Sequence, residues 1–179
     1  VDITAPVAFV KAESVGLKGT ELSHELTEEQ LELLEKIRGM AAERIGFVHH
    51  YSEARQTTPA TPKVIIVSEG QSYVTESGTT IEGKSINLTG RAMSMQKMHK
   101  AFPVTGGLCT AAASQLKGTV VHSCWQETAN TDEVVVGHPS GSMEFVIDIE
   151  DDGTNVTFNK TAVARTSRRL MEGYVYVLK

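Results

Sequence analysis

The residues from His99 to Leu116, HKAFPVTGGLCTAAASQL, combine a basic approach, two adjacent glycines and a run of small and apolar side chains. This pattern predicts a strand, a tight turn at Gly106 and Gly107, and a buried helix that ends near Lys117. The first amides of a helix have no partner within the helix and carry a partial positive charge. The stretch therefore predicts a site for a carboxylate or phosphate oxygen. The alternative is that the two glycines only allow the helix and the sheet to pack closely.

The same stretch lacks the lysine of a nucleotide-binding phosphate loop. Residues 105–110 are TGGLCT, whereas that loop needs a glycine, four residues, and then Gly-Lys-Ser or Gly-Lys-Thr. A nucleoside triphosphate is therefore not an expected ligand.

Basic side chains come just before the glycines, at Lys97, His99 and Lys100. On an extended segment, Lys97 and His99 share one face and Lys100 points to the other. One face could then add positive charge beside the helix start, which would favour a polycarboxylate. The alternative is that these side chains are solvated.

A second polar turn is predicted at Gly137–Gly141, GHPSG. The hydrolase elbow places its serine third of five and leads into a helix, whereas here Ser140 is fourth and a strand is expected to follow. A hydroxyl and backbone donors in a tight turn could still bind a carboxylate. The alternative is that the sequence only forms a hairpin.

Metal and disulfide chemistry are not expected. Cys109, His122 and Cys124 are the one set that could form a soft metal site, and their spacing matches no standard zinc pattern. Two cysteines are too few for a disulfide framework, and buried free thiols are common in apolar helices. We therefore predict no metal and two free cysteines.

The elements that must position these residues form an α+β pattern. A capping box, Thr27–Gln30, starts an amphipathic helix that Gly46 ends. A loop is expected over 49–62 and a loop or weak hairpin over 73–84, and residues 91–98 could be strand or helix. Strands are expected at residues 1–10, 63–68, 85–88, 133–136, 142–149, 155–163 and 173–178. Strands on both sides of one apolar helix favour a sheet that wraps that helix.

Composition limits the class of protein further. The chain has 179 residues, 40% of them hydrophobic, and a formal net charge of −5, which suits one ordinary domain. Its basic residues are spread out, so nucleic acid is not an expected partner. No apolar run approaches the roughly 20 residues that span a bilayer, so no membrane association is expected. We expect a cytoplasmic protein, and a piece of a longer one, since the chain begins within a strand-like run at Val1.

Five segments, in the same order along nearly the whole chain, resemble the carboxy-terminal half of the PrpF family. They are KAESVGLKGTEL (11–22), TPATPKVIIVS (58–68), KMHKAFPVTG (97–106), GHPSG (137–141) and RRLMEGYVYV (168–177). Members of this family are cofactor-independent isomerases of unsaturated tricarboxylates and related acids, including methylaconitate, aconitate, methylitaconate and oxalomesaconate. The resemblance implies no cofactor and the diaminopimelate epimerase-like fold, in which each half wraps a curved, mostly antiparallel sheet around a central helix.

The resemblance also implies where the substrate lies. Residues 1–179 would be a single domain, the carboxy-terminal half of a two-domain isomerase, with a small polycarboxylate in the cleft between the halves. Three residues at the helix start would donate to a substrate carboxylate, with His99 and the turn 138–141 close by. The implied substrate-binding residues are His99, Thr105, Gly106, Gly107, His138, Ser140 and Gly141.

In the family, the lysine and the cysteine thought to move the proton belong to the amino-terminal half. That half is the expected protein partner, and a homodimer is a further possibility. We expect this chain alone to be inactive and to contain no complete acid/base pair.

Two departures from related patterns matter. The epimerases of this fold carry an acid/base cysteine just before the helix, whereas this chain has Phe102–Thr105 there, which argues against a racemase or epimerase. The early strand of the relatives usually carries Asn-Pro, whereas here the residues are Ala5 and Pro6. One polar contact is therefore missing, and a non-catalytic module for carboxylate binding or assembly is the alternative.

Overall fold

A computed structural model describes residues 1–128, 133–151, 155–164 and 169–177. Its main sheet has the strand order β1-β2-β5-β7-β8-β9, with the short strand β6 paired to β5. Only β1–β2 and β5–β7 are parallel pairs, so the expected mostly antiparallel sheet is confirmed. The strands are β1 (Val7–Lys11), β2 (Lys63–Glu69), β5 (Leu88–Ser94), β6 (Lys97–Met98), β7 (Val134–His138), β8 (Gly141–Asp151) and β9 (Val156–Val163).

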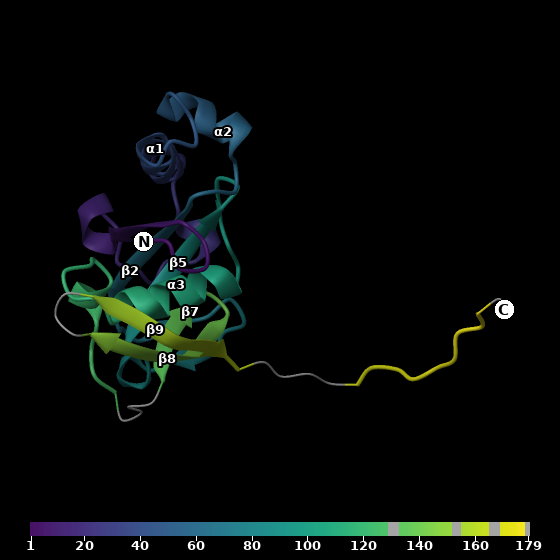
Figure 1. Ribbon diagram of the computed structural model, residues 1–179. Coiled ribbons are helices and arrows are strands. Elements are labelled where there is room, and N and C mark those ends of the chain that lie inside the picture. The colour runs from purple at the N-terminus through teal and green to yellow at the C-terminus, as the bar shows by residue number, and fades with distance from the viewer. Residues whose placement is uncertain (129–132, 152–154, 165–168, 178–179) are drawn as a thin grey trace.

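The apolar helix α3 (Val104–Ser114) lies within the curve of this sheet. Figure 1 shows β8 and β9 on one side of α3 and β2 and β5 on the other. The core between them joins Cys109 and Ala113 of the helix to Val67, Val136 and other strand residues. The α+β fold with a central helix is therefore confirmed.

A second layer covers the other face of the sheet. In β2, Ile65 and Val67 face α3, whereas Val64 and Ile66 pack against α1 (Glu28–Arg44) and its neighbours. Because β2 is buried on both faces, its sequence is continuously apolar rather than alternating. The capping box predicted at Thr27 is present at the start of α1.

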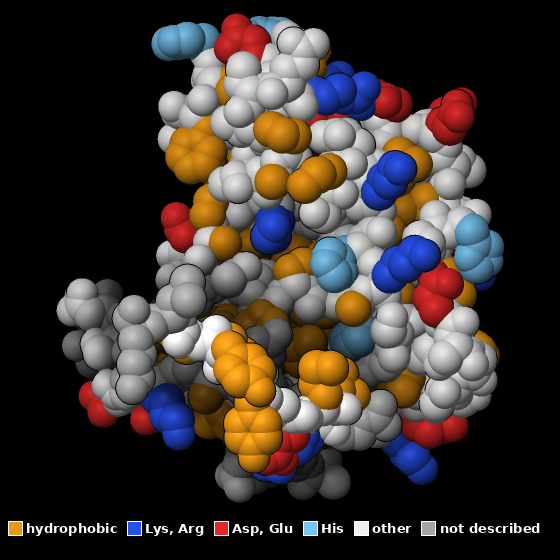
Figure 2. All heavy atoms as spheres, turned by 90° about the vertical axis from the view of Figure 1, so that its right-hand side faces the viewer, with side chains coloured by type: hydrophobic (Ala, Val, Ile, Leu, Met, Phe, Trp, Pro, Cys, Tyr) orange, Lys and Arg blue, Asp and Glu red, His pale blue; other side chains and the backbone are white. Residues whose placement is uncertain are grey.

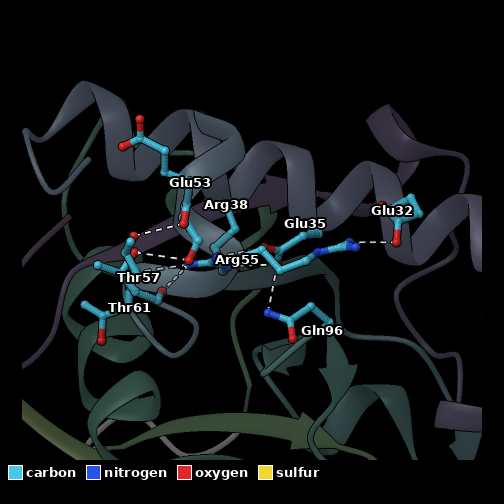
Figure 3. Close-up of polar contacts among 10 residues, drawn as sticks. Glu32, Glu35, Arg38, Glu53, Arg55, Thr57, Thr61 and Gln96 are labelled. Carbon is cyan, nitrogen blue, oxygen red and sulfur yellow. Dashed lines mark hydrogen bonds and ion pairs between the residues drawn. The ribbon is translucent and has the colours of Figure 1, made fainter. Parts of the chain in front are cut away.

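A buried ion pair between Glu35 and Arg38 holds the segment that joins α1 to β2. Figure 3 shows its contacts. Arg38 donates to the carboxylate of Glu35 through Nε and Nη2, at 2.8 and 2.6 Å. Its Nη1 donates to the carbonyl oxygens of Thr58 and Thr61 at 2.6 and 3.3 Å. Both partners of the pair are buried. The segment 49–62, predicted as a loop, contains a 3-10 turn, Tyr51–Glu53, and a short helix, α2 (Ala54–Thr57).

A small hairpin of β3 (Tyr73–Val74) and β4 (Thr80–Ile81) confirms the weak hairpin predicted at 73–84. Other short 3-10 turns lie at Ala12–Val15, Ser23–Glu25, Gly83–Ser85 and His122–Cys124. Among the described residues, no helix is long and apolar enough to cross a membrane.

Several sequence-based boundaries were wrong. The open question over residues 91–98 is resolved in favour of strands, since they form the end of β5, a turn at 95–96 and β6. The first strand was placed too early, because β1 starts only after Pro6, which cannot donate to a ladder. The central helix includes both glycines in its first turn and ends at Ser114. The strand predicted at 173–178 is absent over 173–177, and Leu178 lies outside the described residues. Figure 1 shows this segment extending away from the sheet, which explains why it has no strand partner.

Candidate functional site

The start of α3 presents backbone donors. Pro103 caps the helix in an extended conformation, and the amide of Gly107 donates to its carbonyl at 2.8 Å. The preceding amides, of residues 104–106, hydrogen-bond to no group in the part of the chain that the structure describes. The side chain of Thr105 is exposed beside them. An oxygen anion at this point would meet unsatisfied donors and the positive end of the helix dipole.

The two glycines are explained by packing. A Cβ added at Gly107 would clash with Cζ of Phe145 and would lie 3.2 Å from Cδ1 of Phe102. A Cβ at Gly106 would lie 3.1 Å from Cδ1 of Ile65. The close-packing interpretation thus holds, and it is compatible with the donor interpretation, because the glycines let the helix start pack onto the sheet while the amides of residues 104–106 keep no partner among the described residues.

The amino-terminal segment braces the same turn of the helix. The hydroxyl of Thr4 donates to the carbonyl of Thr105 at 2.7 Å, and Cys109 Sγ lies 3.6 Å from the carbonyl oxygen of Val1. Ala5, where the family resemblance led us to expect asparagine, is half-buried in this segment. The backbone at the helix start is therefore held on its protein side.

The structure brings the second predicted turn to the helix start. The hydroxyl of Ser140 donates to the carbonyl of Lys100 in a very short hydrogen bond. The ring of His138 is stacked on Phe102, with ring centroids 6.2 Å apart and 13° between the planes. Gly141 has a φ of +147°, a conformation that favours glycine, directly after Ser140. The loop before α3 and the turn 138–141 thus form one continuous surface.

His138 is buried and uncharged at neutral pH. The pKa of His138 is lowered from 6.5 to about 4, mainly by burial and also by the neighbouring Arg91 and His99, while a backbone hydrogen bond with Ser142 opposes the shift. The Nδ1 atom of His138 accepts from the amide of Ser140 at 3.3 Å. A neutral imidazole in this position can donate or accept a hydrogen bond, but it is a poor source of positive charge.

The cations are distributed differently from the sequence-based expectation. Lys97 and Lys100 are exposed, whereas His99 is half-buried and accepts from the amide of Ala101 at 3.1 Å. Sequence reasoning missed Lys63, whose Cδ would lie 3.8 Å from a Cβ on Gly106. The sequence could have indicated Lys63, because it starts β2 two residues before Ile65. Residues two apart share one face of a strand, and Ile65 faces α3. Figure 2 shows cationic and histidine side chains on one face of the molecule, beside a hollow with hydrophobic walls.

The thiols are unsuited to proton transfer at the helix start. Cys109 and Cys124 are free, as predicted, and both are buried. Burial raises the pKa of each thiol. No group of three or more metal-ligating side chains occurs among the described residues.

Comparison with known proteins places these features in a family context. The model of the PrpF protein family matches residues 1–178. The chain is 38% identical to the 3-methylitaconate isomerase of Eubacterium barkeri, over 100% of this chain and 47% of that protein. It is 33% identical to the 2-methyl-aconitate isomerase of Shewanella oneidensis, over 97% of this chain and 44% of that protein.

A solved structure shares the architecture. The crystal structure of methylitaconate-delta-isomerase superposes with a TM-score of 0.86 at 36% identity, over 98% of this chain and 45% of that one. The chain thus spans about half the length of the relatives it matches.

Proposed function

This chain belongs to the PrpF protein family, and on that basis we propose that it forms one wall of the active site of an isomerase of unsaturated di- and tricarboxylates. The names of two relatives, a methylitaconate isomerase and a methylaconitate isomerase, support this reaction class. The reaction would be a cofactor-independent allylic proton shift or cis-trans isomerisation.

The observation that carries the proposal is the open helix start beside the joined loop and turn. The amides of residues 104–106 have no partner among the described groups, and the stacked rings of Phe102 and His138 lie next to them. The substrate would be held by the amides of Val104, Thr105 and Gly106, with His99, His138, Ser140 and Gly141 around it. Gly107 would serve through close packing, since its amide is bonded to Pro103.

This arrangement suits the charge that an allylic shift creates. When a base removes the proton next to the double bond, negative charge spreads onto the neighbouring carboxylate as a dienolate. Fixed amide donors at the oxygens stabilise that charge without reorganising. The exposed lysines 97 and 100 would add long-range attraction for a polyanion.

The groups that move the proton would come from an amino-terminal half. Near the helix start, the buried imidazole of His138 has a pKa of about 4, and the thiol of Cys109 has a raised pKa, so neither is poised near neutrality. We infer that a lysine and a cysteine across the cleft act as base and acid. Residues 1–179 would then be a single domain, the carboxy-terminal half of a two-domain enzyme. A cytoplasmic location and a homodimer stay predictions.

An activity assay tests this proposal. The change in ultraviolet absorbance of cis-aconitate, trans-aconitate, methylaconitate and methylitaconate would be followed with the 179-residue chain and with the full-length natural protein. We expect turnover by the full-length protein and none by the chain alone. Turnover by the chain alone would refute the proposal that the groups that move the proton belong to the amino-terminal half. A full-length protein inert on all four acids would refute the isomerase assignment.

The alternative of a non-catalytic carboxylate-binding module rests on Ala5, which lacks the polar side chain expected there. Binding of tricarballylate, a saturated tricarboxylate that cannot isomerise, together with no turnover by the full-length protein, would favour that module. A racemase would instead change the optical rotation of an amino acid substrate.

A further inference from the structure

The turn 137–141 is held from behind by two side chains and one backbone amide. The hydroxyl of Tyr73 donates to the carbonyl oxygens of both His138 and Gly141, at 2.9 and 2.6 Å. The Nη1 atom of Arg91 donates to the carbonyl of Gly137 at 3.3 Å. The amide of Glu76 donates to the carbonyl of Pro139 at 2.9 Å. Four carbonyl groups of one short turn are therefore fixed by groups from elsewhere in the chain.

These groups lie on the face of the sheet opposite α3. In β7, Val134 and Val136 join the core with α3, whereas Val135 packs with Tyr73 and Ile86. A Cβ on Gly137 would point to the same side, 2.9 Å from the hydroxyl oxygen of Tyr73. The turn is thus held from one side, which leaves its other side, with the His138 ring on Phe102, for a ligand.

Arg91 completes the support. Its guanidinium lies over the ring of Tyr73, 4.7 Å from the centroid, and its Nε donates to the carbonyl of Glu21 at 2.7 Å. The residue is fully buried, and its Nη2 is an unpartnered buried side-chain atom among the described residues. Arginine remains charged in proteins.

The charges of Glu21 and Glu25 act on Arg91, but neither acid forms an ion pair with it among the described residues. Both carboxylate oxygens of Glu21 accept from backbone amides, of Lys18 and Gly19. A carboxylate oxygen of Glu25 accepts from the amide of Leu22. The positive charge of Arg91 also acts on the imidazole of His138, across the sheet.

From this geometry we infer that Tyr73 and Arg91 are positioning residues, which aim the turn 138–141 at the substrate. The inference rests on the proposed function for its catalytic consequence. Tyr73 sets the direction of the turn through two carbonyl groups, and Arg91 both fixes Tyr73 and opposes protonation of His138. Neither side chain touches the substrate, so neither is a catalytic residue.

The test uses the full-length protein with Tyr73→Phe, Arg91→Met and Arg91→Lys. Tyr51→Phe and Arg55→Met are matched controls, since Tyr51 and Arg55 lie on the distant α1–α2 side. Tyr73→Phe should raise KM about tenfold with a smaller change in kcat, because the turn binds substrate and two carbonyl groups lose their donor. Both controls should leave KM unchanged.

A second readout does not depend on activity. In histidine-resolved NMR titrations, Arg91→Met should raise the pKa of His138, whereas Arg91→Lys should leave it low, because lysine keeps the charge. A merely structural role would move the pKa in neither variant or equally in both. If Arg91→Met does not fold, Tyr73→Phe still decides through KM.

The two proposals can fail separately. An inactive full-length protein in which Arg91→Met still raises the pKa of His138 would overturn the proposed reaction and support the positioning role. An active enzyme in which Tyr73→Phe keeps the wild-type KM, or in which the titration of His138 is the same in all variants, would overturn the positioning role alone.

Discussion

The imidazole of His138 lies parallel to the ring of Phe102, with 6.2 Å between the ring centroids. The stacking removes one face of the imidazole from water, and only 6% of His138 is exposed. Phe102 immediately precedes Pro103, the cap of α3, so the burial of His138 depends directly on how the helix start packs.

This burial predicts a pH dependence of stability. The pKa of His138 is about 4 in the folded protein and 6.5 for an ordinary histidine, so the unfolded state binds more protons between these values. The free energy of unfolding should therefore fall as the pH drops from about 6.5 to 4, by up to about 3 kcal/mol. Urea unfolding at several pH values measures this decrease in the free energy of unfolding.

The contribution of His138 is isolated by comparing variants, because carboxylates also titrate in this range. His138→Gln should remove that part of the slope, whereas His24→Gln, at an exposed histidine, should keep it. The groups that act on the imidazole are Arg91, His99 and the backbone of Ser142. Equal slopes for the wild type and His138→Gln would show that His138 titrates normally.

Gly107→Ala should destabilise the protein even though alanine favours helices. The added Cβ would clash with Phe145, and overpacking of this kind costs about 1–3 kcal/mol. Thermal unfolding measures the change. Gly173→Ala is the control, since no atom lies within 4 Å of a Cβ there. Adding Phe145→Leu to Gly107→Ala should restore part of the loss, and a stabilising Gly107→Ala would contradict the packing described.

Arg38→Met should be strongly destabilising. It leaves the buried carboxylate of Glu35 without its cation, which typically costs about 3–5 kcal/mol. Arg55→Met breaks a solvent-exposed ion pair with Glu32 and should cost at most about 1 kcal/mol. Chemical denaturation of both variants compares the two pairs, and equal effects would indicate that the Glu35 carboxylate is solvated.

Much of the fold could be predicted from local patterns. Three signals are carried by short segments themselves: the capping box at Thr27, the apolar run of β2, and the glycines on either side of the turn between β7 and β8. The extended segment at 173–177 shows the limit: its alternating aromatic and branched residues have high strand propensity, but a strand also needs a neighbour to pair with. The helix α2 was missed because prolines and small polar residues surround it.

The site could be predicted only in part. Sequence motifs indicated the helix start and the turn at 138–141, and their proximity followed from the family resemblance. The roles of Tyr73 and Arg91 could not be predicted, because they depend on contacts between residues 65 and 46 positions apart in the chain. Nor could the sequence show that the amide of Gly107 donates to the carbonyl of Pro103 and is therefore not free to bind a substrate.

The central claim is that open amides at the start of α3 bind a substrate carboxylate. Val104→Pro removes one of these amides at the first position of the helix, where proline is tolerated. Thr105→Ser, which keeps every amide, is the matched control. Circular dichroism would confirm that the variants keep the fold.

The most direct measurement is calorimetric titration of the full-length protein and these variants with tricarballylate. Val104→Pro should weaken binding by about tenfold or more, as expected for the loss of a hydrogen bond to a charged group, and Thr105→Ser should bind like the wild type. Wild-type affinity in Val104→Pro would contradict the claim and move the carboxylate away from the helix start.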